Sequence, residues 1–454
     1  MPDHQRTFVG AVVISGSVSA KAVETRPSGG VSVFPILAVN FVGTLGFSIV
    51  LPFLVYLVTK LGGNALVYGV MGATYSFFQL LGAPVLGRWS DRYGRRRILL
   101  LCQVGTLVSW GIFLAALWLP VRPLFEVHSP VLGAFTLTVP LVVLFVARAL
   151  DGTTGGSVSV ANAYLADISD DTNRSANFGK MAVSANLGFV LGPAIAGALG
   201  AMAMGETLPV LAAFAISVMA SLMVAFWLPE TEPCALRTDP ETFSVRKVLG
   251  QDHKPCFRLA AAPKLSIAAI LALPSVGLLL ALYFLVFLAF NLFYVSFPVY
   301  AATGIRWSLA ETGAFFSVMG LTMALVQGPV LKRASKIWSD RVLVLGGSLV
   351  LAASFPFFSA ADTATLYVGT ALLALGNGVM WPSLLSVLAK SAGRNLQGTV
   401  QGLAGSVAAV AGIIGLLAGG LLYDGLGSHV FVISAALTLL TFVLAFAIPA
   451  TARK

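Results

Sequence analysis

Charged residues are scarce in this chain: only 10% of its 454 residues are Asp, Glu, Lys or Arg, while 57% are apolar. A soluble domain carries about 25% charged and roughly 45–50% apolar residues, so the composition argues against a water-soluble enzyme. A helix that crosses the ~30 Å hydrocarbon core of a membrane needs about 20 apolar residues. The sequence therefore predicts a polytopic membrane protein with no room for a large soluble domain, which disfavours a receptor or scaffold.

Cysteine and histidine are also rare, with three and four copies. Cys102, Cys234 and Cys256 show no metal-ligand spacing and support no disulfide framework. The four histidines fall in tails, in loops or at the ends of apolar runs, so the sequence offers no buried histidine for catalysis. We therefore expect no enzyme activity, no cofactor and no metal site.

Twelve apolar runs follow one another, each compatible with a tilted helix across the bilayer. They cover residues 32–58, 66–87, 98–118, 136–164, 182–203, 207–228, 273–300, 309–331, 342–360, 364–388, 399–421 and 428–449. We expect helices throughout, because lipid cannot hydrogen-bond an open strand edge. The polar segment 229–272 divides the runs, so the predicted fold is all-α, with six helices in 32–228 and six in 273–449.

Positive charges are distributed unevenly between the two ends of these runs. If the N-terminus is cytoplasmic, all but four of the 28 Lys and Arg residues fall on the cytoplasmic side; the four are Lys60, Arg122, Arg148 and Arg306. We therefore expect the tails 1–31 and 450–454 and the loop 229–272 to be cytoplasmic. The same bias accounts for the formal charge of +10, so no nucleic-acid partner is implied.

Two short internal repeats support the division into six plus six helices. Residues 83–88, which end the second run, are echoed by residues 328–333 at the end of the eighth, and glycines of the fifth run are echoed in the eleventh. Such doubling is typical of secondary transporters, in which the substrate site lies at the midplane between two units that rock about it.

An acidic residue lies among five arginines after the second run, in Gly87-Arg88-Trp89-Ser90-Asp91-Arg92-Tyr93-Gly94-Arg95-Arg96-Arg97. A basic turn would explain the arginines and Gly94, but not the acid at this spacing. The pattern closely resembles the signature loop of the major facilitator superfamily. The resemblance implies a cytoplasmic gate of Gly87, Asp91, Arg92, Gly94, Arg95 and Arg96, in which Arg95 bridges Asp91 to Asp167 and Asp91 lies near the start of the eleventh span.

The fifth run carries a pattern of small residues: Gly179, Gly188, Gly192, Pro193 and Gly197. Small residues let a neighbouring helix approach closely, and a proline removes one helical hydrogen bond. A tight helix crossing alone would explain the pattern, but the spacing also resembles the antiporter motif of the drug/proton branch of the superfamily. We expect Gly188, Gly192 and Gly197 to bring the fifth span close to the eighth.

Shorter matches run along nearly the whole chain, including Gly376-Asn377-Gly378 with Trp381-Pro382 in the tenth run. Together they resemble the tetracycline-efflux family and its relatives, which include animal organic-anion transporters. One departure is Gly43, where the tetracycline pumps often carry an acid about nine residues before a proline. This departure puts tetracycline in question as the substrate.

Two charged residues lie well inside a span: Arg148 and Asp151, three residues apart and therefore on one helix face. A charge at the bilayer centre costs at least about 2.5–3.5 kcal/mol on insertion scales, so such residues usually pair and face a cavity. The pair could simply lock helix packing. Alternatively, Arg148 favours the charged form of Asp151, burial favours the neutral form, and access to water tips the balance. Asp151 is then the predicted proton carrier.

Polar and aromatic residues at helical spacing are the candidates for substrate binding. They are Asn40, Tyr75, Gln79, Arg148, Asn291, Tyr294, Asn377 and Trp381. The aromatic stripe in the seventh run fits lipid contact or packing as well as a pocket wall, but an aromatic-lined cavity suits amphipathic organic molecules.

We hypothesise a monomeric proton-coupled antiporter that exports such compounds from the cytoplasm by alternating access. The alternative is a facilitator for organic anions or metabolites, in which Arg148 binds the substrate and Asp151 holds Arg148.

Overall fold

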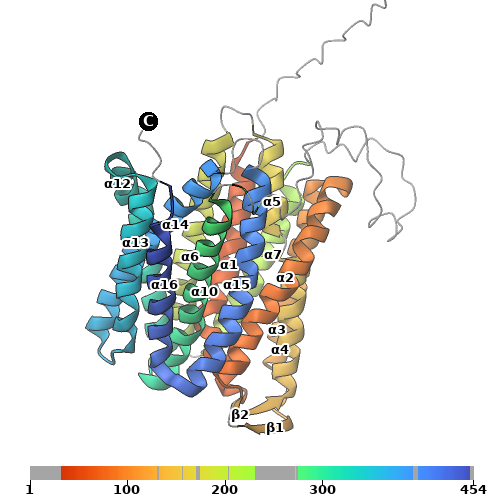
Figure 1. Ribbon diagram of the computed structural model, residues 1–454. Coiled ribbons are helices and arrows are strands. Elements are labelled where there is room, and N and C mark those ends of the chain that lie inside the picture. The colour runs from red at the N-terminus through yellow and green to blue at the C-terminus, as the bar shows by residue number, and fades with distance from the viewer. Residues whose placement is uncertain are drawn as a thin grey trace, which may run out of the picture. The chain divides into compact units, whose positions relative to one another are not determined.

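Helices make up nearly all of the described chain (Figure 1). The computed structural model describes residues 32–129, 132–155, 157–169, 174–202, 204–230, 271, 273, 275–391 and 397–449. Within its helices it leaves aside the side chains of Leu51, Pro52, Asp91, Arg174, Ser175, Ala176, Ala182, Ala389, Gln397, Gly398, Thr399, Gln401 and Gly402. The predicted tails and most of the predicted loop 229–272 lie outside the described residues.

The helices before residue 230 are α1 (Phe34–Lys60), α2 (Ala65–Tyr93), α3 (Arg95–Ala116), α4 (Val139–Thr154), α5 (Ser157–Asp167), α6 (Arg174–Gly200) and α7 (Thr207–Phe226). We call these seven the N-terminal helices. The C-terminal helices are α10 (Val276–Val299), α11 (Leu309–Leu325), α12 (Leu331–Ile337), α13 (Asp340–Ser354), α14 (Thr363–Ser391), α15 (Gln397–Leu426) and α16 (Val430–Ala445). Short π-helical or 3-10 turns extend or join them: η3 (Tyr300–Gly304), η4 (Val326–Val330), η5 (Phe355–Ser359) and η6 (Gly427–His429).

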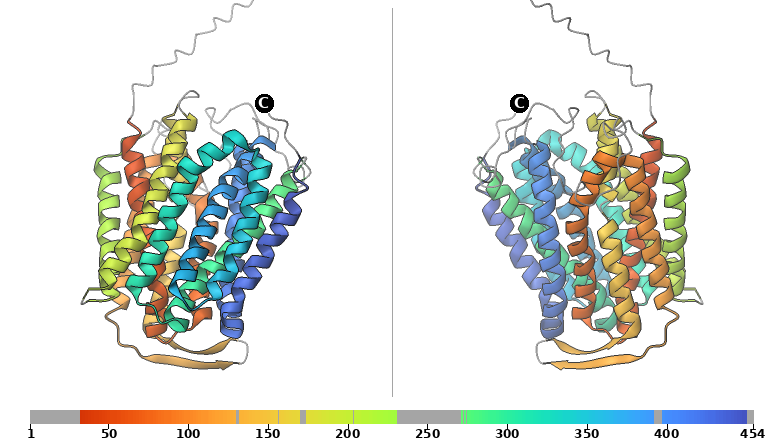
Figure 2. Two further views of the ribbon diagram at one scale, coloured as in Figure 1. Left: turned by 90° about the vertical axis from the view of Figure 1, so that its left-hand side faces the viewer. Right: turned by 90° about the vertical axis from the view of Figure 1, so that its right-hand side faces the viewer.

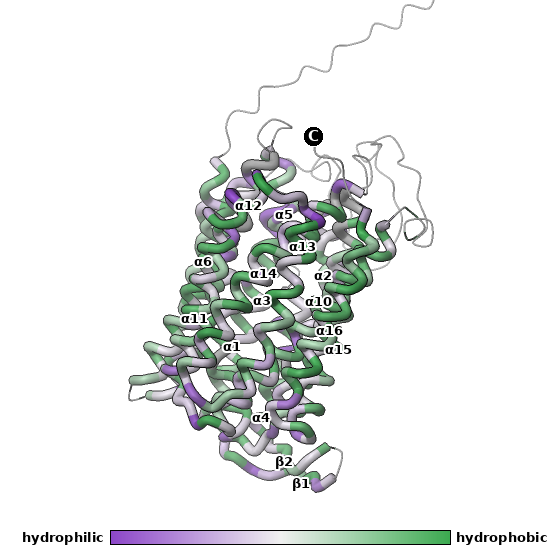
Figure 3. Tube along the Cα trace, turned by 60° about the vertical axis from the view of Figure 1, so that its left-hand side comes forward, coloured by the Kyte–Doolittle hydropathy of each residue, from purple (hydrophilic) through white to green (hydrophobic). Residues whose placement is uncertain are grey.

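Ten helical segments of the described chain are long and apolar enough to cross a membrane, and α1, bent by 41° between Val50 and Phe53, makes an eleventh. One segment, Val139–Asp167, combines α4 and α5, and the last, Leu403–Ala445, contains most of α15 and all of α16. Each of the twelve predicted runs therefore falls on a helix. Apolar residues cover the middle of these helices, while hydrophilic residues gather toward their ends (Figure 3).

A β hairpin between α3 and α4 is absent from the sequence prediction. Strand β1 (Pro123–Ser129) pairs antiparallel with β2 (Gly133–Thr138), so the predicted fourth span began too early at residue 136. The error arose because β2 and α4 form one apolar run, and hydropathy alone cannot divide it. A proline in the first turn of α4 marks the true start of the helix.

The hairpin is fixed to the turn between α1 and α2. The Thr136 amide donates to the Gly62 carbonyl at 2.8 Å, and the Thr138 hydroxyl donates to the Leu61 carbonyl at 2.9 Å. Gly62 has a φ of 97°, which a residue with a side chain rarely adopts. We call this end of the helices the hairpin end, and the end where α2 meets α3 the opposite end.

The two groups of helices stand side by side (Figure 2) and meet where α6 crosses α11 and α2 crosses α15. A Cβ atom added to Gly313 of α11 would lie 2.6 Å from the Cα of Gly197 on α6. A Cβ atom added to Gly69 of α2 would collide with the Leu416 carbonyl on α15. Both crossings lie toward the hairpin end, where small residues allow backbone contact.

The predicted antiporter glycines divide between two neighbours. Gly197 does contact α11, but Gly188 and Gly192 do not, and for them the prediction was wrong. A Cβ atom on Gly188 would lie 2.9 Å from the Leu45 amide nitrogen of α1, and one on Gly192 would collide with Ser48. At 100° per residue, Gly197 points about 180° away from Gly188, so the two glycines cannot serve the same partner.

Candidate functional site

The predicted charge pair is formed on α4. The Arg148 Nη1 atom lies 3.2 Å from the Asp151 Oδ2 atom, and both side chains are buried. The Arg148 guanidinium also lies over the Tyr75 ring of α2, with its Cζ atom 4.4 Å from the ring centroid. A carboxylate and an aromatic face therefore fix the guanidinium from two directions.

Close contact between α2 and α4 makes this arrangement possible. A Cβ atom on Gly152, the residue after Asp151, would collide with the Tyr75 carbonyl. Gln79 then ties the two helices together, because its amide donates to the Gly155 carbonyl at 3.0 Å and lies 3.2 Å from the Tyr75 hydroxyl. The glycines let Tyr75 reach Arg148.

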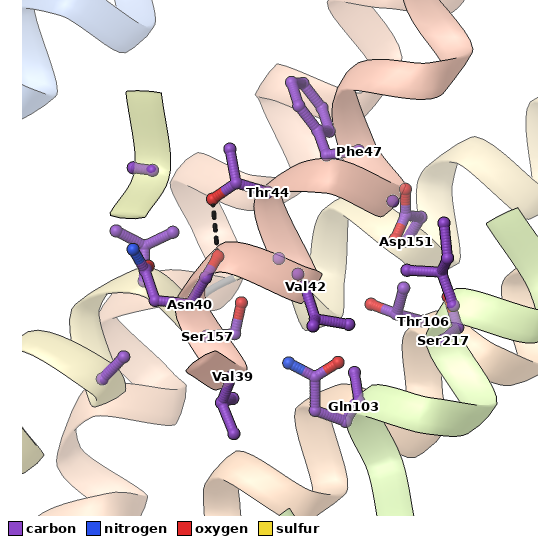
Figure 4. A pocket seen from close by; sticks show the side chains of 18 of the residues that line it. Val39, Asn40, Val42, Thr44, Phe47, Gln103, Thr106, Asp151, Ser157 and Ser217 are labelled. Carbon is purple, nitrogen blue, oxygen red and sulfur yellow. Dashed lines mark hydrogen bonds between the residues drawn. The ribbon is translucent and has the colours of Figure 1, made fainter. Parts of the chain in front are cut away.

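A cavity of about 320 Å³ lies beside the pair, and all of its lining residues come from the N-terminal helices. Its polar lining residues are Asn40, Thr44, Gln79, Gln103, Thr106, Asp151, Ser157 and Ser217, several of which are seen in Figure 4. Its aromatic lining residues are Phe47, Tyr75, Trp110 and Phe189. Asp151 lines the cavity, whereas Arg148 is not among its lining residues. The carboxylate is thus the member of the pair that the cavity reaches.

A family profile described as Major Facilitator Superfamily matches residues 36–416 of the chain and, in a second alignment, residues 279–454. This chain belongs to the Major Facilitator Superfamily. It is therefore an integral, multi-pass membrane protein and a secondary transporter of small molecules, and not an enzyme.

Named relatives cover most of this transporter. It is 25% identical over 393 residues to the class B tetracycline resistance protein of Escherichia coli, across 86% of this chain and 87% of the relative. It is 30% identical over 395 residues to the major facilitator superfamily domain-containing protein 10 of Bos taurus, across 82% and 77%.

Solved structures share the fold. The human organic anion transporter MFSD10 (TETRAN) aligns with a TM-score of 0.63 and 23% identity, covering 92% of this chain and all of that one. A D-xylose–proton symporter aligns with a TM-score of 0.70 and 12% identity, covering 92% and 98%. These two likenesses establish the fold alone.

The structure separates the predicted substrate residues of the transporter into two groups. Asn40, Tyr75 and Gln79 line the cavity together with Asp151. Asn40 also joins α1 to α6, because its amide donates to the Ser184 hydroxyl at 2.8 Å and to the Met181 carbonyl at 3.1 Å.

The predicted residues of the C-terminal helices are not among those that line the cavity. Trp381 packs against Tyr283 and Phe287, each with ring centroids 4.6 Å apart. The ring of Tyr294 lies 5.6 Å from that of Phe290. The Asn291 amide donates to the carbonyl of Phe287 on its own helix, and the Asn377 amide contacts the Met323 sulfur at 3.9 Å. The aromatic stripe of the seventh run, which includes Tyr283, Phe287 and Tyr294, thus belongs largely to an aromatic core of the C-terminal helices.

Five polar residues of the cavity were missed in the sequence: Thr44, Gln103, Thr106, Ser157 and Ser217. Gln103 and Thr106 are three residues apart on α3, so they share a helix face. Gln103 is only 6% exposed, although an amide in the middle of an apolar helix usually needs a partner. A search for amides inside apolar runs would have found Gln103.

At the opposite end, part of the predicted gate network is present. The Arg95 Nε atom lies 2.8 Å from the Asp167 Oδ2 atom, as predicted. Gly94 joins α2 to α3 with a φ of 105°, and the Arg96 amide donates to the Glu230 carboxylate at 2.9 Å. The predicted contact of Arg95 with Asp91 involves a side chain outside the described part. The Arg92 guanidinium lies 5.6 Å from the Tyr93 ring centroid, and among the described residues a Cβ atom on Gly87 or Gly179 would meet nothing within 4 Å.

Proposed function

We propose that this transporter is a proton-coupled antiporter that exports amphipathic organic compounds, with both termini and the opposite end in the cytoplasm. The observation that carries the proposal is the position of the Arg148–Asp151 pair. The carboxylate lines a mostly apolar cavity that contains several polar side chains, and the Arg148 guanidinium, its counter-ion, packs on the Tyr75 ring. Asp151 can therefore take up a proton from the cavity, and the positive charge of Arg148 then stays outside the cavity, against the Tyr75 ring.

Protonation would change the packing around Arg148. The neutral acid attracts the guanidinium less strongly than the anion does, so Arg148 would then rely on its contact with Tyr75. Because α2 and α4 touch at Gly152, a shift of Arg148 would reach α2 directly, and α2 also crosses α15. Proton binding at Asp151 would in this way bias the contact between the N-terminal and C-terminal helices.

The aromatic lining supports an amphipathic substrate. Phe47, Tyr75, Trp110 and Phe189 offer flat apolar surface, with Asn40 and Gln79 as polar anchors. In this proposal Asn291, Tyr294, Asn377 and Trp381 form the opposing wall of a site between the two groups of helices, the position usual in secondary transporters. The relatives named for tetracycline resistance support export as the direction.

An organic-anion carrier is the second candidate, because the Arg148 Nε atom is buried and has no hydrogen-bond partner in the described chain. An anionic substrate would have to displace Asp151 or enter when Asp151 is neutral. The human fold relative is named as an organic anion transporter. Substrate charge therefore belongs in the experiment.

The experiment measures uptake into reconstituted vesicles against an imposed pH gradient, with tetracycline and the anionic dye fluorescein as probes. We expect Asp151→Asn to abolish gradient-driven accumulation while the probe still binds. Asp362→Asn is the matched control, since Asp362 is an exposed acid that caps α14 by accepting the Thr365 amide at 2.8 Å, and asparagine caps equally well. Uphill accumulation by Asp151→Asn would remove Asp151 from the mechanism. Accumulation of fluorescein alone, lost on Arg148→Ala, would favour the anion carrier.

A further inference from the structure

The Gln103 side-chain amide is buried but has no hydrogen-bond partner among the described residues. The amide lines the cavity at 6% exposure, and no hydrogen bond joins it to any other residue of the described chain. The Ser157 hydroxyl of α5 also lines the cavity and likewise lacks a hydrogen bond within the described residues. Buried polar groups without protein partners are normally satisfied by water or by a ligand.

Space and chemistry around these groups favour water. A cavity of about 320 Å³ is far above the ~10–15 Å³ that a single water molecule needs, so it has room for several. Gln103 and Thr106 share one face of α3, and both line the cavity together with Asp151. Gln103 and Thr106, which we call the polar ladder, therefore lie along one wall of the cavity on the way to Asp151 (Figure 4).

The location of this ladder argues against the transported compound as its occupant. Gln103, Thr106 and Asp151 lie on α3 and α4, and none of the three belongs to the substrate wall proposed above. Alternating access moves one group of helices against the other around a site that lies between them. A compound held in this part of the cavity, wholly among the N-terminal helices, would move with those helices and would not be released by the motion. Water and protons need no such release.

We infer that the space between Gln103 and Asp151 is a hydrated compartment through which Asp151 exchanges its proton, with Gln103 as the residue that positions the water. The inference rests on the proposed role of Asp151. A proton on a cavity hydronium passes to a carboxylate oxygen of Asp151, leaving a neutral water, and the reverse transfer releases it. Gln103 is a positioning residue, since its amide donates to one water and accepts from another and never carries the proton.

Few other titratable groups face Asp151 within the described chain. Arg148 lies beside it on α4, and Tyr75 approaches it from α2. From α3 the neighbour is the uncharged Thr106. A change in proton exchange after substitution of Gln103 therefore reports on the water path rather than on a new charge.

The test follows protonation of Asp151 after a rapid pH jump, read in the purified protein from the infrared carbonyl band that Asp151→Asn removes. No transported compound is needed. We expect Gln103→Leu to slow this protonation about fivefold, the factor that corresponds to about 1 kcal/mol, one hydrogen bond. Gln103→Asn keeps the amide and should stay within about twofold of the parent protein.

A cavity-filling variant supplies a second, independent test. A Cβ atom on Gly43 would lie 3.7 Å from the Gln103 amide nitrogen, an ordinary contact, so Gly43→Leu can occupy the compartment while Gln103 remains. We expect it to slow protonation as Gln103→Leu does. Gly346→Leu is the matched control, because a Cβ atom there meets nothing within 4 Å and α13 lines no part of this cavity.

The outcomes separate this inference from the proposed function. If Asp151→Asn removes no infrared band, Asp151 does not titrate and both fail. If the band is present but Gln103→Leu and Gly43→Leu protonate at the parent rate, only the hydrated compartment is refuted. Weaker tetracycline binding by Gln103→Leu with an unchanged protonation rate would also refute it, since the space between Gln103 and Asp151 would then hold the transported compound.

Discussion

The contact between α6 and α11 predicts how a single methyl group would shift this transporter between its states. A Cβ atom on Gly313 would lie 2.6 Å from the Gly197 Cα atom and 2.7 Å from the Pro193 carbonyl oxygen. Ordinary contacts begin near 3.4 Å, so Gly313→Ala falls about 0.8 Å short of the needed space. Both obstacles are backbone atoms that cannot rotate away, and the helices would have to separate.

Overpacking of this kind costs about 1–3 kcal/mol. The described structure, in which α6 and α11 are in backbone contact at the hairpin end, is here called hairpin-closed. The cost applies only to this state, because it is avoided in a hairpin-open state, in which the two helices separate at that end. We therefore expect Gly313→Ala to lower the ratio of hairpin-closed to hairpin-open molecules by a factor of about 5–150.

Spin labels at Met202 and Ala361, both exposed near the hairpin end on different groups of helices, would report the two populations as two distances. The measurement uses a cysteine-free background. Gly346→Ala is the control, because a Cβ atom at Gly346 meets nothing within 4 Å in the described chain and α13 takes part in neither crossing. An unchanged distance distribution in a folded Gly313→Ala protein would refute the reasoning, as would an equal shift in the control.

Two further predictions concern side chains that hold helices together. Tyr56→Phe removes the hydroxyl that lies 2.8 Å from the Trp307 carbonyl oxygen, joining α1 to the start of α11, so the hairpin-closed population should fall about fivefold in the same distance measurement. Tyr164→Phe should leave it unchanged, since that hydroxyl donates to Pro229 among the N-terminal helices. Arg148→Lys should lose most transport in the vesicle assay, nearly as much as Arg148→Ala, because an ammonium lacks the planar fork that meets Asp151 and the Tyr75 face together. Near-normal transport by Arg148→Lys would mean that charge alone suffices.

The helices were largely predictable from the sequence because lipid imposes a simple rule: each span needs a long apolar helix. The same rule misplaced the start of α4. Residues Thr136–Thr138 end strand β2, but they continue directly into the apolar sequence of α4, so hydropathy counted them as part of the helix. Hydropathy measures composition, whereas the hairpin depends on hydrogen bonds to Leu61 and Gly62, which are distant in sequence.

The site was predictable only where one helix carried the information. Arg148 and Asp151 share a face of α4, so their spacing revealed the pair. The cavity is assembled from seven helices, and no spacing within one helix could show that Gln103 faces Asp151. The partners of Gly188 and Gly192 were mistaken for the same reason, because a small-residue face shows that a helix approaches but not which one.

Several glycines with open space around them indicate which state of the transport cycle the structure represents. Gly87 on α2 and Gly405 on α15 lie toward the opposite end, and so do Gly179 on α6 and Gly328 in η4; a Cβ atom on any of them would meet no atom of the described chain within 4 Å. The same two pairs of helices make backbone contacts through glycine at the hairpin end. Small residues let two helices approach closely. Glycines at both ends of these helix pairs are therefore explained if each pair closes at one end when it opens at the other, as alternating access requires. We infer that the structure is the state closed at the hairpin end, and that Gly87 and Gly179 of the two sequence motifs become helix contacts in the state that alternates with it.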